Sequence, residues 1–433
     1  MKRAFYFFGC IFLLTVFGFG EPMTLTKEDC FDLTLENNTD LKESSLSLDS
    51  SERSYKNSWN LFLPSLSADV SLSKSHAATG DQTRLSPGLS AQYTFRPSLG
   101  DSIRRLRLAH DSMLISYEEA RRQTLLAVES EFYYLISARS ALEIKKKNID
   151  LAGQIYNQTL IKFNNGLVPE LEVLQAKVNE ANLVPQYSSS EASYKKRFKE
   201  FLLVLGVDPM TEVILDGDIE IEDIDLKAED LITAFLENRA DIALQRKSVS
   251  ILKSSLGSRR KERLLPTLSV SARWNDSVAD PFSSGAWDGH DFDGTTTVSI
   301  GLSIPLDGNI PGSQDDLDEK DARDSLTAAE MKLETLIDEA GLEIINLVNA
   351  LETDKANLEL SELNLQLSET SYKTTQTAFE KGTASRTSLD DAQQDLLTAR
   401  QNLLESRFAY KKDLIALRGA LGLNIDDPMG RNE

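Results

Sequence analysis

The segment FNNGLVPELEVLQA at residues 163–176 returns in altered form as FEKGTASRTSLDDA at residues 379–392. Leu205-Gly206 is matched by Leu421-Gly422 at the same offset of 216 residues (163 to 379). Two further pairs of matching segments occur earlier in each repeat and in the same order. They are Glu36-Asn37 with Glu237-Asn238, and Leu63–Ser67 with Leu265–Ser269. The sequence therefore predicts a duplicated unit of about 200 residues, much longer than a solenoid repeat.

The duplication divides the chain into four predicted parts: a signal peptide at 1–20, a first repeat at 21–225, a second repeat at 226–425 and a C-terminal tail at 426–433. Lys2 and Arg3 precede an apolar run that ends in small residues, which is typical of a secretory signal peptide. Cys10 lies inside that run, too early for a lipidation site. No later run approaches the roughly 20 apolar residues of a membrane-spanning helix, so we expect an exported protein.

An acidic stretch, DPMTEVILDGDIEIEDIDLKAED, joins the two repeats at residues 208–230. Asp216, Asp218 and Glu220 alternate as they would at the start of a calcium loop. However, Ile221 stands where such a loop needs glycine, and Lys227 stands where it needs a bidentate glutamate. The pattern favours a solvated connector over a calcium site.

Each repeat is predicted to contain a long helical hairpin, at about 98–205 and about 313–421. Apolar residues recur every seven positions, which indicates a packed helical seam. Gly166 and Gly382 should end the first helix of each hairpin, because glycine adopts the left-handed conformation that closes a last turn. Pro169 suits the start of one returning helix, and Ser385 or Ser388 could cap the other. The two ladders are Val128, Leu135, Leu142, Ile149, Tyr156 and Phe163, and Ile337, Ile344, Leu351, Leu358, Leu365, Tyr372 and Phe379.

Each repeat also contains two predicted strands, at about 64–76, 85–96, 265–276 and 295–306. Their residues alternate strictly between apolar and small polar types. Two interpretations fit: a sheet covering a soluble core, or part of a transmembrane β-barrel. Four strands cannot close a barrel, whereas three chains would supply twelve. The side chains predicted to face lipid are Leu66, Val70, Val298, Ile300 and Leu302.

Composition excludes several classes of protein. A formal net charge of −21 over 433 residues argues against a nucleic-acid partner. Two cysteines and three histidines rule out a disulfide scaffold and make a metal cage improbable. No phosphate-binding loop occurs. Gly100-Asp101-Ser102 resembles a hydrolase motif, but the required Asp-x-x-His pair is absent, since Asp288 lies only two residues before His290. We therefore expect no catalytic residue, cofactor or metal.

The order of strand pair, long helix, F-x-x-G turn and LG ending, present twice over residues 24–425, resembles the TolC-like outer membrane efflux proteins. The resemblance implies a mainly α fold with a transmembrane β part. It implies a homotrimer whose strands form a twelve-stranded barrel in outer-membrane lipid and whose helices form a second barrel across the periplasm. It also implies two further partners, a periplasmic adaptor and an inner-membrane transporter that supplies the energy.

Two sets of site residues follow from the same resemblance. The adaptor is expected at the hairpin tips, Gly166, Leu167 and Val168 in one repeat and Gly382, Thr383 and Ala384 in the other. A ring of aspartates is expected to narrow the periplasmic entrance. Asp391 matches that pattern, with Asp390 as its neighbouring competitor, while Ser388 departs from it. Many members carry arginine at the position of Ala384, and Arg386 lies close by.

The resemblance favours a passive, trimeric exit channel of a tripartite efflux pump or a type I secretion system. The alternative from another class is a secreted coiled-coil structural or adhesive protein without a pore. A periplasmic hydrolase would rest only on Gly100–Ser102. The duplication and the alternating strands favour the channel.

Overall fold

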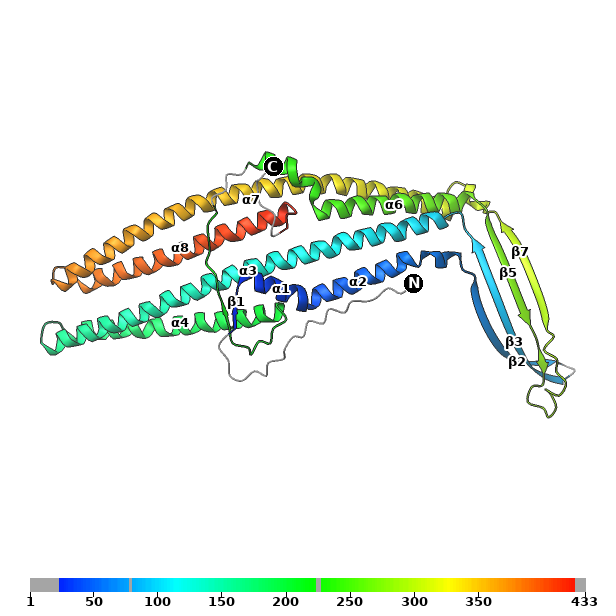
Figure 1. Cartoon of the computed structure of the whole chain (residues 1–433), viewed down its shortest axis with the longest axis horizontal. Helices are drawn as coiled ribbons and strands as arrows, with labels where there is room; N and C mark the ends of the chain where they lie inside the picture. Colours follow the sequence, from blue (N-terminus) through cyan, green and yellow to red (C-terminus); the bar gives the residue numbers. More distant parts are fainter. Residues whose placement is uncertain (1–22, 78–79, 223–226, 425–433) are drawn as a thin grey trace, which may run out of the picture. The chain divides into compact units, whose positions relative to one another are not determined.

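A computed structural model describes residues 23–77, 80–222 and 227–424 (Figure 1). The expected signal peptide at 1–20 and the expected tail at 426–433 lie outside these residues. The helices are α1 Lys27–Asn37, α2 Thr39–Lys56, α3 Leu99–Asn164, α4 Glu170–Val204, α5 Ala228–Phe235, α6 Ala240–Leu264, α7 Gln314–Glu380 and α8 Arg386–Ala420. The strands are β1 Met23–Leu25, β2 Ser65–Ala77, β3 Gly80–Phe95, β4 Val213–Leu215, β5 Thr267–Asn275, β6 Val278–Ala279 and β7 Thr295–Ser303.

The chain is mainly helical, and its described residues divide into two compact units that each draw on both sequence repeats. Unit 1 takes its residues from Met1–Asn38, Ala127–Glu222 and Ala356–Lys411. Unit 2 takes its residues from Thr39–Leu126, Asp223–Lys355 and Lys412–Glu433. The long helices α3, α7 and α8 contribute to both units, so a duplicated sequence has not produced two separately packed halves.

In unit 1 four helical segments lie side by side in the order α4, α3, α8, α7 (Figure 1). Part of the predicted seven-residue ladder is buried in these contacts: Val128, Leu135 and Leu358 are buried, and the other ladder residues of unit 1 apart from Phe163 are half-buried. Phe163, next to the tip, is exposed because fewer helices surround it. The hydrogen bonds that join neighbouring helices include Lys145 to Ser190 (α3–α4, 2.7 Å), Gln393 to Asn148 (α8–α3, 2.5 Å) and Ser361 with Ser406 (α7–α8, 2.9 Å).

The acidic connector is partly built into unit 1. Its β4 pairs in parallel with β1, so that Leu25 lies beside Leu215, and both side chains are buried. Arg139 of α3 donates a hydrogen bond to the Leu215 carbonyl at 2.6 Å, and Ile219 is also buried. The expectation of a solvated connector is therefore wrong for Leu215 and Ile219, whereas Asp216 and Asp218 between them are exposed. Apolar side chains at alternate positions pack against the helices, while the acidic ones between them face water.

Unit 2 contains an antiparallel sheet in the order β2-β3-β5-β7, with the short β6 beside β3. The pairing places Leu66, Ala91, Ala272 and Val298 in one row across the sheet. The adjacent row consists of Ser65, Gln92, Ser271 and Ser299, which belong to the opposite face. The register therefore collects the apolar side chains of all four strands on one face and the small polar ones on the other.

The sheet is open at both edges and bare on its apolar face. Among the described strands, β2 and β7 each pair on one side only. Leu66 is 77% exposed and Ile300 is 75% exposed. Val70, Val298 and Leu302 are exposed as well. Apolar side chains this accessible on a regular sheet indicate a surface made to contact something other than water.

The duplication is also visible where the hairpins end. Asn38 follows Glu36-Asn37, and Arg239 follows the matching Glu237-Asn238. In unit 1 the Asn38 side chain donates a hydrogen bond to the Val204 carbonyl, the last residue of α4, at 3.0 Å. In unit 2 Arg239 donates to the Ala420 carbonyl, the last residue of α8, also at 3.0 Å. Equivalent residues thus satisfy equivalent helix-end carbonyls, which have no partner within their own helix.

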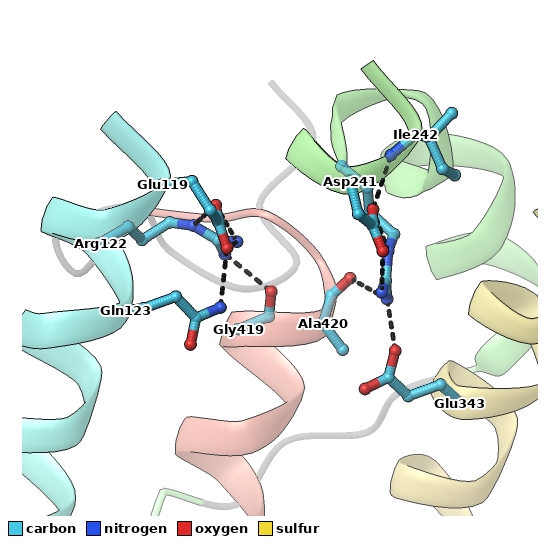
Figure 2. Close-up of polar contacts among 9 residues, drawn as sticks. Glu119, Arg122, Gln123, Asp241, Ile242, Glu343, Gly419 and Ala420 are labelled. Carbon is cyan, nitrogen blue, oxygen red and sulfur yellow. Dashed lines mark hydrogen bonds and ion pairs between the residues drawn. The ribbon is translucent and has the colours of Figure 1, made fainter. Parts of the chain in front are cut away.

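A second guanidinium, besides that of Arg239, reaches the end of α8. Arg122 of α3 donates to the Gly419 carbonyl at 2.7 Å and is held by Glu119, while Arg239 is held by Asp241 and Glu343 (Figure 2). Burial alone would raise the pKa of Asp241, but the hydrogen bond and charge of Arg239 outweigh it and keep that pKa below its usual value. These pairs fix the end of α8 against α3, α6 and α7.

Candidate functional site

The two hairpin tips of unit 1 share one backbone geometry. Gly166 and Gly382 have positive φ angles of 73° and 76°. At the first tip the Gly166 amide donates to the Phe163 carbonyl at 2.8 Å, and the Leu167 amide donates to the Lys162 carbonyl at 2.9 Å. The second tip repeats both bonds with Gly382 and Thr383. This paired pattern is the Schellman motif, which requires a left-handed residue and so favours glycine.

The tips present their side chains outward. Leu167 is 71% exposed, Thr383 is exposed, and Val168 and Ala384 are half-buried. No heavy atom lies within 4 Å of a Cβ placed on Gly166 or Gly382, apart from their own chain neighbours. The glycines at the tips are therefore constrained by the backbone alone. Gly206 differs, because a Cβ there would clash with Asn37.

The start of α8 carries a buried polar link between the hairpins. Ser385 caps this helix, since its hydroxyl accepts a hydrogen bond from the Ser388 amide at 3.1 Å. Arg386 is only 7% exposed. Its Nε donates to the Asp390 carboxylate at 2.8 Å, and its Nη1 donates to the Thr159 hydroxyl of α3 at 3.2 Å. Arg386 therefore joins the second hairpin to the first.

A cation–π contact between the two hairpins lies nearer the tips. The Lys162 ammonium of α3 stands 4.1 Å from the centroid of the Phe379 ring of α7. Sequence reasoning noted Arg386 but missed its partner Thr159 and this cation–π pair. The only local signal is the spacing of four between Arg386 and Asp390, which places both on one face of a helix. The partners on α3 are more than 200 residues away, and only the packing reveals them.

The three residues proposed for the constriction take different positions on α8. Asp391 and Ser388 are exposed and lie about one turn apart, on a face that also includes Asp395. Asp390 is half-buried, and its carboxylate forms a salt bridge with Arg386. Of the two neighbouring carboxylates, Asp391 is therefore the exposed one, and Asp390 belongs to the link between the hairpins.

The hydrolase-like motif does not form a catalytic group. Gly100, Asp101 and Ser102 lie in the first turn of α3, where Asp101 pairs with Lys261 at 2.8 Å. His290 pairs instead with Asp276 at 2.7 Å. Asp276 follows the far end of β5, whereas α3 follows Phe95, which pairs with the near end of β5. The strand therefore separates Ser102 from His290.

The family model described as "Outer membrane efflux protein" matches residues 31–206 and 231–423 of the chain. The chain belongs to this family. Its role is that of an outer-membrane exit duct. Each of the two matched segments covers one hairpin and the strand pair before it. The relatives found are channel proteins rather than enzymes. The family gives no support to a secreted coiled coil without a pore.

Named relatives agree with this assignment. The probable efflux pump outer membrane protein TtgC of Pseudomonas putida is 23% identical over 403 residues, which cover 90% of this chain and 81% of the relative. The antibiotic efflux pump outer membrane protein ArpC of the same species has the same identity and coverage.

Solved structures show the same fold. The Campylobacter jejuni CmeC outer membrane channel superposes with a TM-score of 0.76 at 17% identity, covering 93% of this chain and 87% of that one. The open-state Neisseria gonorrhoeae MtrE outer membrane channel gives 0.73 at 15% identity, covering 92% and 89%. At these identities the likeness concerns the fold alone, and it extends over both hairpins and the sheet.

Proposed function

We propose that three copies of this protein form one passive duct. Their sheets make a twelve-stranded barrel in the outer membrane, and their hairpins make a helical barrel across the periplasm. The observation that carries this proposal is the sheet of four long strands, β2, β3, β5 and β7, with two open edges and a bare apolar face. Open edges cannot exist in lipid, so the edge strands of neighbouring copies must pair with each other. An even count of twelve strands is well within the range of membrane barrels.

The test is to purify the full-length protein from outer membranes in mild detergent. A mass of three chains, together with conductance in planar lipid bilayers, supports the proposal. A stable monomer without channel activity contradicts it.

The proposed layout of the chain keeps a signal peptide at 1–20, a first repeat at 21–225, a second repeat at 226–425 and a C-terminal tail at 426–433.

The hairpin tips are the proposed docking site for a periplasmic adaptor, which would connect the duct to an inner-membrane transporter. The exposed Leu167 at one tip and Thr383 at the other give such a partner a mixed apolar and polar surface. The named relatives are parts of efflux pumps, which favours a pump over type I secretion for this chain as well.

We further propose that the periplasmic end opens when the two hairpins of each copy move apart. Arg386 is the main obstacle, because it is buried and bonded to Thr159 across the hairpins. Hydrogen bonds to charged groups contribute about 1.5–3 kcal/mol. Three such links in a trimer would hold the closed state firmly, and any partner that parts the hairpins must break them.

Thr159→Val is expected to favour the open state. The change keeps the shape of the side chain but removes the hydroxyl that accepts from Arg386. Loss of one such bond corresponds to a shift of roughly 10- to 150-fold in the closed–open equilibrium of each copy. Single-channel recording should therefore show more frequent and larger openings. Thr124→Val on the same helix is the matched control, because the Thr124 hydroxyl donates only to its own helix backbone at Ala120. Equal behaviour of both variants would contradict the link.

Asp391 is proposed to form a threefold ring of negative charge at the periplasmic entrance. Asp391→Ala should reduce the preference of the closed pore for cations, because three carboxylates raise the local negative potential. Asp390→Ala should instead release Arg386 and increase opening. Reversal potentials and open probability in planar bilayers separate the two effects. A normal cation preference in Asp391→Ala, with a lost preference in Asp390→Ala, would show that the register is wrong by one residue.

A further inference from the structure

Unit 1 contains a cavity of about 440 Å³ that lies on α3, between α4 and α8. Its lining extends along α3 from Tyr134 to Lys145, which is a rise of about 16 Å along the helix. The cavity is therefore an elongated slot, and its volume falls within the usual range of small-molecule sites. All the residues that line it belong to unit 1, so its shape is set within one packed body.

One end of the slot is aromatic. It is lined by Tyr134 of α3, Tyr194 of α4 and Phe408 of α8. The rings of Tyr134 and Phe408 meet edge to face with centroids 5.5 Å apart, and the Arg197 guanidinium lies 3.7 Å from the Tyr134 centroid. Burial raises the pKa of Tyr194, so its hydroxyl stays neutral. Rings that are held in place before a ligand arrives favour the binding of another aromatic ring.

The other end of the slot is polar. The half-buried Lys145 donates a hydrogen bond to the Ser190 hydroxyl at 2.7 Å. An ammonium group has three hydrogens to donate, so Lys145 can also bind an acceptor on a ligand. Gln401 of α8 lies in the same lining. Among the described residues that line the slot, Lys145 and Glu405 carry the only charges, and these are of opposite sign.

The slot opens on the side of the helical layer that faces away from the connector. Arg139 of α3 and Tyr410 of α8 both donate to connector carbonyls, at 2.6 Å and 2.7 Å (Figure 1). Around α3, Tyr134 and Lys145 point about 120–140° away from Arg139. Around α8, Glu405 points about 140° away from Tyr410. The connector and the slot therefore occupy different sides of the same two helices.

The side that carries the slot also carries Asp391. Glu405 lies two seven-residue repeats after Asp391 on α8, with Thr398 between them, and all three are exposed. Residues seven apart lie on one face of a packed helix. In the proposed duct Asp391 faces the lumen, so the slot opens into the lumen as well.

We propose that this slot binds an uncharged, planar aromatic compound that carries a hydrogen-bond acceptor. The ring of the compound lies among Tyr134, Tyr194 and Phe408, and its acceptor receives a hydrogen bond from Lys145. The balanced charges of the lining disfavour a ligand with a net charge, because one of the two charged side chains would always repel it. The inference rests on the proposed duct for its place in the lumen, and it names a class of solute that pauses there.

The test is calorimetric titration of the purified full-length trimer with 7-methoxycoumarin, which is uncharged and has a carbonyl acceptor. Saturable binding is expected, with one molecule for each chain. Ser193→Phe should abolish it, because Ser193 lines the slot and the larger ring fills it. Ala192→Phe is the matched control, since Ala192 is exposed on the same helix but points about 100° away. Lys145→Met should weaken binding by roughly tenfold or more through loss of a charged donor.

Equal affinity in Ser193→Phe and Ala192→Phe, or an unchanged affinity in Lys145→Met, overturns the site. Coumarin-3-carboxylate is the charged comparison and should bind more weakly than 7-methoxycoumarin. Tighter binding of the carboxylate overturns the assignment of an uncharged ligand. In planar bilayers 7-methoxycoumarin should reversibly reduce the current through the unsubstituted channel but not through Ser193→Phe. Bound compound without any effect on the current overturns the position in the lumen.

These outcomes separate the slot from the duct. A trimer that conducts but shows no saturable binding overturns this inference and leaves the proposed function intact. A protein that binds the compound but is monomeric and does not conduct overturns the duct, together with the lumen position of the slot.

Discussion

Ile300→Arg is expected to abolish assembly in the outer membrane. Ile300 lies near the middle of β7, opposite Val270 of β5, and its side chain is 75% exposed on the apolar face. An arginine at the midplane of a lipid-facing strand costs about 2–4 kcal/mol. A trimer contains this substitution three times, so the total penalty of about 6–12 kcal/mol is comparable with the 5–15 kcal/mol by which proteins are typically stable.

Ser299→Arg is the matched control for this substitution. Ser299 precedes Ile300 on the same strand and pairs with Ser271, so its side chain belongs to the polar face. We expect that variant to assemble and to alter only conductance. The measurement is the amount of heat-sensitive trimer in the outer-membrane fraction. If both variants assemble equally well, the sheet does not face lipid.

Replacing Gly166 and Gly382 together by valine is expected to abolish export. Both positions have positive φ, which costs residues with a branched Cβ about 1–3 kcal/mol each. No neighbouring atom would clash with a Cβ at either position, so the strain lies in the backbone dihedral angles. Only a change in the conformation of the turn can relieve it. The changed turn would move Leu167 and Thr383 away from their positions at the tips. The trimer should still form, because neither glycine packs against another element.

The control for the tips is the double replacement by asparagine, which tolerates the left-handed conformation. That variant should retain most export. Export is measured as resistance of living cells to a transported compound, and trimer content is measured in parallel. Full export by the valine variant would show that the tip geometry is not needed for docking. Loss of the trimer in that variant would show that the tips support folding instead.

Most of the helical architecture could be predicted from periodicity. A seven-residue ladder long enough to cover Val128 to Phe163 leaves little choice but a long packed helix, and the glycines at the tips then impose a hairpin. The alternation in residues 64–76 and 295–306 similarly assigned the two faces of the sheet, because side chains on a strand have a strict period of two. These features depend only on neighbours along the chain.

Contacts between distant segments could not be predicted in this way. The strand β4 has only three residues in an acidic stretch, and it forms because β1 and Arg139 lie beside it. The link from Arg386 to Thr159 joins residues that no local spacing relates.

The duplication, the two glycine-turned hairpins and the two-faced strands are readable from the amino-acid sequence, since each follows from a local period or a backbone requirement. The folded chain was needed to reveal the order α4–α3–α8–α7, the open edges of the sheet and the exposure of Leu360, Leu363 and Leu367 on α7. This is because an apolar residue in a helical ladder is the same residue type whichever neighbouring helix covers it. A periodic apolar seam predicts that a partner exists, and the packing of the folded chain shows which seams remain without one.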